Sequence, residues 1–360
     1  MDAARTWPCP ALRGAELGPR TTLKVGGRAA WLLEPGDPDV LREAWLAARE
    51  AGCDFRRYDT EEDLAADSDS SFDPGSSSGP GAPTLRVLGG GANLVVGDGD
   101  LDMVVLATSA MRRTFRPLDP GEALTEEEAI ASSVGVHEPA APSIAVDDPR
   151  LVCWAGASMP GLVRTATELG WTGLEGLIGV PGNLGGGLAM NAGGKWGELW
   201  DVVDLVRVLT PDGELVDVPR DQASPGYRDG GLDRIGAAVV VGAVLRLELS
   251  TKKEVEGRAR EFLFEKRAAQ PVTEASAGCV FQNPTEEWQG RRWSAGLLID
   301  HLGLKGRRRG AAVVSELHGN YLLNEGGATA ADVFALIDEL RHEVADRTGI
   351  ELAVEVKRWR

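Results

Sequence analysis

The chain has 360 residues and a formal net charge of -17, with 43% hydrophobic and 26% charged residues. Such a composition is typical of a soluble globular protein, and the length allows two or three domains. No apolar run is long enough to span a membrane, and no export signal is visible in residues 1–19. No basic stripe beyond Lys305–Arg309 suits nucleic acid. We therefore expect a cytoplasmic protein that binds neither membrane nor nucleic acid.

The negative charge is concentrated in two segments. Asp59–Pro83 carries seven acidic residues and no basic one, and Pro117–Pro149 carries eight acidic residues and no Lys or Arg, so the rest of the chain carries only about -2. Both segments are rich in Ser, Pro, Gly and Ala, and such sequences bury too little apolar surface to become ordered. We therefore interpret them as acidic insertions in surface loops, with 59–83 disordered.

The cysteines argue against a metal site and against a disulfide framework. Cys9, Cys53, Cys153 and Cys279 are widely spaced, and no C-x-x-C pair occurs. Zinc sites, iron–sulfur clusters and disulfide-rich folds need closer or paired cysteines. We expect no metal and a reducing compartment.

Apolar runs, helix caps and glycine breaks predict the elements of the first half of the chain. In chain order they are a helix from Asp37-Pro38 to Gly52, short strands at 85–88, 103–106 and 151–154, and a helix between Ser158 and Gly170.

The second half continues with mixed elements. They are a hairpin of 205–209 and 215–218 around Pro211-Asp212-Gly213, a long strand at 238–249, a helix at 254–269, a helix that Thr329–Asp332 opens and Gly349 ends, and a final strand at 352–356. Because strands, hairpins and helices alternate without a regular βαβ order, the predicted fold class is α+β.

Two glycine-rich stretches, Leu88–Val96 and Val180–Gly187, are the most informative feature of the sequence. Glycine lets a ligand approach main-chain N–H groups directly. Neither stretch contains G-x-G-x-x-G, so the common dinucleotide motif is absent from both. Each alone is most simply a tight turn, but together they indicate one long phosphate-bearing ligand held from two sides.

Four polar residues are candidates for chemistry, and each also has an ordinary structural explanation. Cys279 could be a small buried hydrophobic residue. Glu355 could point to solvent by strand alternation, or inward, where burial would raise its pKa. Arg228 could be a surface turn residue, and His318 a core histidine with satisfied hydrogen bonds.

The chain resembles the UDP-N-acetylenolpyruvoylglucosamine reductase family in the order and spacing of eight motifs. The resemblance covers most of the chain from Thr21 to Trp359, apart from the two acidic insertions. The motifs are Thr21–Gly27, Gly89–Leu94, Gly173–Gly182, Met190–Gly193, Gly226–Arg228, Ala277–Pro284, Leu298–Gly306 and Glu355-Val356. The segment from Leu249 to Glu261 is too short for the tyrosine-bearing substrate lid of one branch, so the chain is similar to the shorter, type II-like branch.

The resemblance implies a two-part FAD-binding unit of the vanillyl-alcohol oxidase type followed by an α+β substrate-binding domain. The implied division is a first FAD-binding subdomain at 1–108, a second at 109–249, a substrate-binding domain at 250–347, and a C-terminal strand at 348–360 that returns to the active site.

The resemblance also implies that FAD is held largely by main-chain groups. The implied FAD contacts are Gly89, Gly90, Gly91, Ala92, Asn93, Leu94, Val180, Pro181, Gly182, Gly185, Gly186, Asn191 and Ala192.

The implied reaction reduces the enolpyruvyl ether of UDP-N-acetylglucosamine enolpyruvate to UDP-N-acetylmuramate, a peptidoglycan precursor, with NADPH as hydride donor. Arg228 and Glu355 match the residues that stabilise the enolate-like intermediate. Cys279 stands where many members have the serine that donates a proton. A thiol, with a pKa of about 8.5, is a stronger acid than the hydroxyl of serine. Arg267 and Asn283 match contacts of the anionic substrate.

Two alternatives stay open. One is a different FAD-dependent oxidoreductase of the same superfamily, which would explain the glycine stretches but not the set Arg228, Cys279 and Glu355. The other is a non-catalytic flavin-binding redox sensor that uses Cys279. For the reductase we expect a monomer whose partner is a small-molecule sugar-nucleotide substrate.

Overall fold

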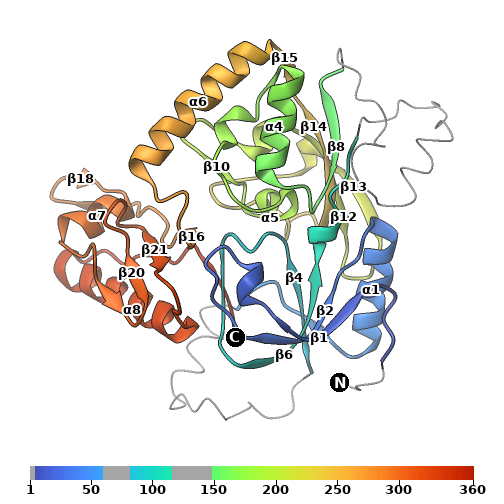
Figure 1. The fold of residues 1–360 in the computed structure, drawn as a ribbon, viewed down its shortest axis with the longest axis horizontal. Helices are drawn as coiled ribbons and strands as arrows, with labels where there is room; N and C mark the ends of the chain where they lie inside the picture. The colour runs from blue at the N-terminus through green and yellow to red at the C-terminus, as the bar shows by residue number, and fades with distance from the viewer. Residues whose placement is uncertain (1–4, 60–81, 116–147) are drawn as a thin grey trace.

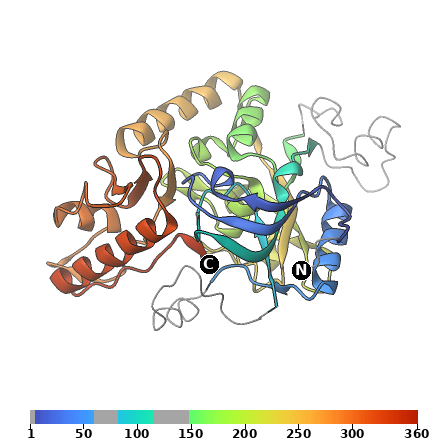
Figure 2. The ribbon, with the colours of Figure 1, turned by 60° about the horizontal axis from the view of Figure 1, so that its bottom comes forward.

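The computed structural model describes residues 5–59, 82–115 and 148–360. The two predicted acidic insertions lie almost entirely outside these residues (Figure 1). The described chain builds three larger sheets with helices packed against them, as two views show (Figures 1 and 2).

The first sheet has the order β1-β2-β6-β4-β3 and is parallel except for β1. Helix α1 (Pro38–Glu50) begins after Asp37, whose carboxylate accepts a hydrogen bond from the N–H of Val40, so the predicted cap is confirmed. The Trp45 indole of this helix donates to the carbonyl of Pro211 in the second sheet's hairpin, at 3.1 Å. The strands are β1 (Ala11–Glu16), β2 (Arg28–Leu33), β3 (Asp54–Phe55), β4 (Thr84–Leu88) and β6 (Asp100–Ala107).

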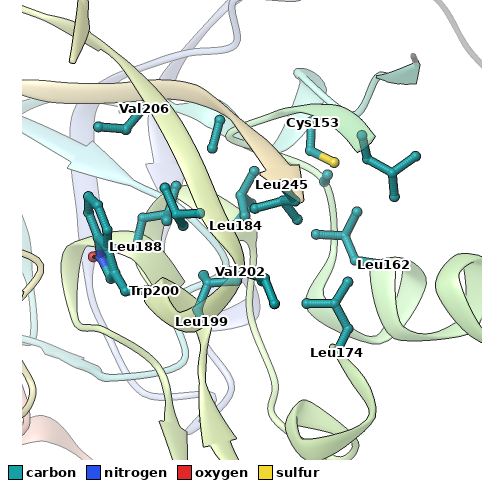
Figure 3. Close-up of a cluster of buried hydrophobic side chains, with 14 of the residues drawn as sticks. Cys153, Leu162, Leu174, Leu184, Leu188, Leu199, Trp200, Val202, Val206 and Leu245 are labelled. Atoms are coloured by element: carbon teal, nitrogen blue, oxygen red, sulfur yellow. Dashed lines mark hydrogen bonds between the residues drawn. The ribbon is translucent and has the colours of Figure 1, made fainter. Parts of the chain in front are cut away.

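The second sheet is antiparallel throughout, with the order β13-β12-β14-β8-β7. Helices α4 (Met159–Leu169) and α5 (Leu184–Ala189) pack on it, and their leucines meet its inward-facing side chains in the core drawn in Figure 3. Ser158 and Gly170 cap α4 as predicted. The strands are β7 (Thr114–Phe115), β8 (Arg150–Trp154), β12 (Val203–Leu209), β13 (Leu215–Pro219) and β14 (Val239–Arg246).

Helix α6 (Lys252–Ala269) leads from the second sheet to the third (Figure 1). Thr251 and Glu254 form a capping box at its start. The third sheet has the order β16-β21-β20-β19, and α7 and α8 contribute to its core. Its elements are β16 (Ser276–Cys279), α7 (Ala295–His301), β19 (Arg308–Arg309), β20 (Ala312–Val314), β21 (Tyr321–Asn324) and α8 (Ala330–Thr348).

The end of the chain returns to its beginning. Strand β22 (Lys357–Trp359) pairs in parallel with β5 (Leu94–Val96), which forms the end of the first glycine stretch. Just before it, Val354 forms an isolated bridge with Phe281 beyond β16. The C-terminal segment therefore connects β5 with the segment that follows β16 of the third sheet. Figure 1 places the C-terminus beside the first sheet.

The remaining elements are short. Two-residue strands pair as β9 (Trp171–Thr172) with β15 (Glu248–Leu249), β10 (Gly193–Gly194) with β11 (Gly197–Glu198), and β17 (Glu287–Trp288) with β18 (Arg291–Arg292). The 3₁₀ helices are η1 (Gly18–Arg20), η2 (Thr108–Ala110), η3 (Glu175–Leu177), η4 (Leu199–Val202) and η5 (Arg220–Gln222). Within the described ranges, no helix combines the length and apolar character needed to cross a bilayer.

The α+β prediction is confirmed, but two predicted strands were wrong in extent. The predicted strand 352–356 is irregular, because the N–H of Glu355 bonds to Val280 and the ladder begins only at Lys357. The predicted strand 238–249 is divided, since β14 ends at Arg246 and residues 248–249 pair with β9 instead. In both cases an apolar run continued past the point where the backbone changed partners.

Candidate active site

The two glycine stretches, about ninety residues apart in sequence, meet main chain to main chain. A Cβ placed on Gly90 would lie 2.5 Å from the Cα of Gly182 and 2.9 Å from the N of Asn183, closer than real Cβ contacts allow. Gly91 has a φ of 59° and is pressed against Arg20 in the same way, with a Cβ position 2.6 Å from its carbonyl oxygen. Glycine is therefore required at this contact for steric reasons.

The first stretch offers main-chain donors. Among the described residues, the N–H groups of Gly90, Gly91, Ala92 and Asn93 donate to no acceptor. On the second stretch, a Cβ on Gly186 would meet nothing within 4 Å, which leaves open space beside its backbone. Several free N–H groups on a glycine-lined loop form the kind of concavity that binds a diphosphate. The residues present thus fit the pyrophosphate of FAD.

The other predicted FAD contacts differ in their availability. Gly185 is not free, because its N–H donates to the carbonyl of Ala155 at 2.9 Å. Gly89 lies close to the second stretch, with its Cβ position 3.6 Å from the N of Gly186. Leu94 is buried in β5, whereas Val180 and Ala192 are half-buried and Pro181 is exposed.

Asn191 has a structural role that the sequence does not reveal. Its side chain is buried, and its Nδ2 donates to Glu198 at 2.7 Å and to the carbonyl of Gly226 at 3.1 Å. Its Oδ1 accepts from the N–H of Trp200 at 3.3 Å. Asn191 therefore fixes the turn that carries Arg228.

Arg228 and Glu355 form a partly buried ion pair. The Nε of Arg228 lies 2.8 Å from the Oε1 of Glu355, and their side chains are 19% and 7% exposed. A second guanidinium nitrogen of Arg228 donates to the carbonyl of Gly193 at 3.2 Å. Glu355 thus points inward, which settles the alternative left open by the sequence. Arg228 holds a φ of 56°, a left-handed conformation that non-glycine residues adopt at a cost.

The charges of this pair depend on each other. Burial raises the pKa of Glu355 although Arg228 and Lys357 oppose the shift. Burial would lower the pKa of Arg228, but Glu355 and neighbouring groups raise it overall. The guanidinium therefore stays charged, and a carboxylate that leaves its ion pair would protonate more readily than one in water.

Cys279 ends β16 near this pair. Burial, with a smaller contribution from Glu355, raises the pKa of its thiol to about 11. Its strand partner is Tyr321 of β21, whose hydroxyl hydrogen-bonds the sulfur and whose own pKa is raised by burial. The thiol is therefore protonated at neutral pH, as a proton donor must be. The cluster of Arg228, Glu355, Cys279 and Tyr321 is called the reaction cluster below.

Two predicted substrate contacts lie differently. Arg267 is exposed near the end of α6, and the structure does not bring it to the reaction cluster. Its neighbour Lys266 points inward instead, and its ammonium donates to the carbonyls of Gly176 and Ile178. Asn283 lies close to the cluster in sequence, and its Oδ1 accepts from the N–H of Ala295 at 3.0 Å, at the start of α7.

Sequence reasoning missed Tyr227 and Tyr321. Tyr227 is 54% exposed, and its hydroxyl accepts a hydrogen bond from the backbone of Asn283, so it connects the Arg228 turn with the third sheet. The pairing of Tyr321 with Cys279 depends on strand register, which the sequence does not display. His318 is held locally, with its Nδ1 accepting from the N–H of Asn320. No cluster of potential metal ligands occurs in the described parts of the chain.

Comparisons with known proteins agree with this geometry. Residues 270–359 match the family model described as UDP-N-acetylenolpyruvoylglucosamine reductase, C-terminal domain, and residues 140–219 match the model described as FAD binding domain.

Curated relatives with the name UDP-N-acetylenolpyruvoylglucosamine reductase include one from Deinococcus radiodurans, 37% identical over 76% of this chain and 83% of the relative. Another, from Geobacter metallireducens, is 34% identical over 96% of this chain and 93% of the relative. The crystal structure of UDP-N-acetylenolpyruvylglucosamine reductase from Thermus caldophilus matches with a TM-score of 0.66 and 28% identity over 98% of both chains. The chain belongs to the UDP-N-acetylenolpyruvoylglucosamine reductase family, whose cofactor is FAD.

Proposed function

We propose that this protein reduces the enolpyruvyl ether of UDP-N-acetylglucosamine enolpyruvate to UDP-N-acetylmuramate, with NADPH as the hydride donor. We also propose that it is a monomeric cytoplasmic enzyme of peptidoglycan precursor synthesis. The observation that carries the proposal is the meeting of a charged arginine, a buried carboxylate and a protonated thiol, from three distant parts of the chain, in one cluster.

The chemistry that bound FAD would supply is hydride transfer from the nicotinamide to the methylene carbon of the enolpyruvyl group. The N–H groups of Gly90–Asn93, which donate to no described acceptor, would bind its pyrophosphate, and the Gly182–Gly186 backbone would line it. We propose the 13 residues named from the sequence as the contacts of this cofactor.

The protein must then stabilise negative charge and deliver a proton. Arg228 is placed to bind the substrate carboxylate, into which charge delocalises after hydride transfer. Glu355 orients the guanidinium through its 2.8 Å ion pair. The Sγ–H of Cys279 supplies the proton to the carbon next to the methylene, and Tyr321 donates a hydrogen bond that stabilises the thiolate left behind.

Purified holoenzyme tests the proposal directly. NADPH oxidation should depend on UDP-N-acetylglucosamine enolpyruvate, with one equivalent of UDP-N-acetylmuramate formed for each NADPH oxidised. NADPH oxidation of equal rate without the sugar nucleotide would instead support a general flavin oxidoreductase. An Arg228→Met variant that retains FAD is the matched control, and it should lose the sugar-nucleotide-dependent rate only.

The redox-sensor alternative is disfavoured by the state of the thiol. Sensor cysteines are accessible and have a lowered pKa, so that the reactive thiolate is present. Burial raises the pKa of Cys279 to about 11 instead. Cys279 is thus suited to give up a proton to a substrate and poorly suited to react with an oxidant.

We propose Asn283 and Arg267 as substrate contacts, with Asn283 contributing more to binding than Arg267. The free amide Nδ2 of Asn283 faces no acceptor among the described residues, whereas Arg267 lies outside the cluster. Asn283→Ala should therefore raise the KM for the sugar nucleotide more than Arg267→Met does. If Arg267→Met raised the KM as strongly as Asn283→Ala, the end of α6 would have to approach the substrate when it binds.

A further inference from the structure

A pocket with a volume of about 580 Å³ opens beside the reaction cluster. Its walls come from the turn at 227–233, the segments 57–59 and 189–190, the C-terminal segment 354–358 and the single residue Gln282. Because Arg228 lines this pocket, a ligand bound there lies next to the reaction cluster. The charged groups on the walls therefore bear on what the pocket binds.

Three of the four cations on the pocket walls already have partners. Arg228 pairs with Glu355. Arg57 pairs with Asp233 and also donates to the carbonyl of Ala237. Arg358 is buried and is engaged as well, so none of these guanidinium groups is a free cation.

Lys357 differs from these three. Its ammonium makes no ion pair and no hydrogen bond with any residue that the structure describes, and it lies over the ring of Tyr58, with 5.0 Å between Nζ and the ring centroid. Burial lowers its pKa, although Glu355 and Asp229 oppose the shift. A half-buried ammonium without a protein acceptor needs water or a bound anion to satisfy its donors, and an anion also compensates its charge.

The acids nearest to Lys357 are already engaged. Glu355 accepts from Arg228. Asp229 accepts from the N–H of Gly231 at 2.7 Å and pairs with Arg234 at 2.9 Å. Asp59 and Asp233, the other acids on the pocket walls, pair with Arg86 and Arg57. Each of these four carboxylates is therefore already paired with an arginine.

The backbone holds Lys357 in this position. Its N–H donates to the carbonyl of Asn93 at 3.0 Å, and β22 continues in parallel with β5. The residue lies two positions after Glu355, so the same short segment supplies a carboxylate to the reaction cluster and a cation to the pocket.

We propose that the ammonium of Lys357 binds an anionic group, a phosphate or a carboxylate, of the nucleotide that enters this pocket. This inference rests on the proposed function for the identity of the nucleotides but not for the presence of the anion site. It assigns Lys357 as a ligand-binding residue, with Arg228 as its neighbour in the pocket.

Equilibrium binding to the FAD-loaded protein tests the proposal without turnover. The probes are NADP⁺, NAD⁺, UDP-N-acetylmuramate and UDP, each titrated against the flavin spectrum. A charge-assisted hydrogen bond is worth about 10- to 100-fold in affinity, so Lys357→Met should weaken at least one probe by that factor. Lys357→Arg should retain most of the affinity, and Lys253→Met, an exposed lysine on α6, should change none.

The pattern of losses identifies the anion. Weakening of NADP⁺ but not NAD⁺ places the 2′-phosphate at Lys357, weakening of both dinucleotides places their shared diphosphate there, and weakening of UDP-N-acetylmuramate but not UDP places the carboxylate there. Weakening of UDP-N-acetylmuramate and UDP alike places the sugar nucleotide's diphosphate there.

Three results would overturn the proposal: all four affinities within twofold of wild type, equal losses in Lys357→Met and Lys357→Arg, or loss of FAD itself in Lys357→Met alone. If the protein did not turn over the sugar nucleotide but Lys357→Met still weakened binding as expected, the proposed function would be wrong and the anion site would stand.

Discussion

The two glycine stretches and the reaction cluster meet the demands of one site by different means. At the glycine contact, main chain packs on main chain, and an added methyl group at Gly90 has no room. In the cluster, the side chains of Arg228 and Glu355 pair across 127 positions of sequence, and a lost charge has no substitute. The first region is therefore sensitive to added volume and the second to removed charge.

The largest effect should come from breaking the charge pair. Glu355→Gln keeps the shape but removes the charge, and loss of such electrostatic stabilisation lowers kcat by about 10²–10³-fold. Arg228→Met should lower kcat as strongly and also destabilise the fold by about 3 kcal/mol, because it leaves a buried carboxylate unpaired. Steady-state kinetics and chemical denaturation measure the two effects.

The matched control for this pair is Arg207→Met. Arg207 pairs with Asp217 at 2.6 Å, but both side chains are about half exposed. An exposed pair contributes at most about 1 kcal/mol. If Arg228→Met and Arg207→Met had equal effects on stability and activity, the reaction cluster would have no special role.

Added volume at the glycine contact should give the next largest effect. Gly90→Ala must push Gly182 and Asn183 away, and such overpacking costs about 1–3 kcal/mol. Because the same loop is proposed to bind the pyrophosphate, the variant should also purify with little FAD. Absorbance of the bound flavin and thermal unfolding measure both losses.

Gly257→Ala is the control for the glycine contact. A Cβ on Gly257 meets nothing within 4 Å on helix α6, so the change should leave FAD bound and the protein as stable or slightly more stable. Normal FAD content in Gly90→Ala would contradict the required close approach of the two stretches.

Lys266 sharpens the comparison, because it supports the second glycine stretch from outside. Its ammonium bonds to carbonyls just before that stretch, and burial lowers its pKa from 10.5 to about 8. Between pH 8 and 10.5 the unfolded chain holds the proton and the folded chain does not, so stability rises with pH there. The shift corresponds to an upper limit of roughly 3 kcal/mol.

The measurement is the free energy of unfolding against pH for the wild type and Lys266→Met. Their difference should change with pH between 8 and 10.5 and be constant above that range. A difference that does not vary with pH would show that Lys266 has an ordinary pKa in the folded protein.

The smallest effect concerns the thiol. Because the pKa of Cys279 is about 11, its alkylation by iodoacetamide should be slow at pH 8 and increase toward pH 11. Tyr321→Phe removes a hydrogen bond to the sulfur, so it should shift this profile to higher pH. Peptide mass spectrometry distinguishes Cys279 from the other three cysteines, and an unchanged profile would remove Tyr321 from the cluster.

The sequence predicted what depends on neighbouring residues. The caps at Asp37, Ser158 and Thr329 each begin a helix as expected, because a cap bonds to an N–H only a few positions ahead. The hairpin around Pro211-Asp212-Gly213 was equally local. The resemblance to the family then predicted catalytic roles for Arg228, Cys279 and Glu355.

What the sequence could not predict depends on contacts between distant segments. The inward direction of Glu355 follows from its bonds to Arg228 and Val280, not from the alternation of a strand. The partner of Cys279 follows from the register of β16 and β21. Lys357 stands out only because the structure shows which nearby acids are already engaged.

The assignment of Cys279 as proton donor is the central claim, and stopped-flow kinetics of the two half-reactions tests it most directly. In Cys279→Ala, flavin reduction by NADPH should stay within twofold of wild type, while reoxidation by UDP-N-acetylglucosamine enolpyruvate falls by about 10²-fold or more. Cys279→Ser should reoxidise faster than Cys279→Ala. Reoxidation of Cys279→Ala at the wild-type rate would contradict the assignment.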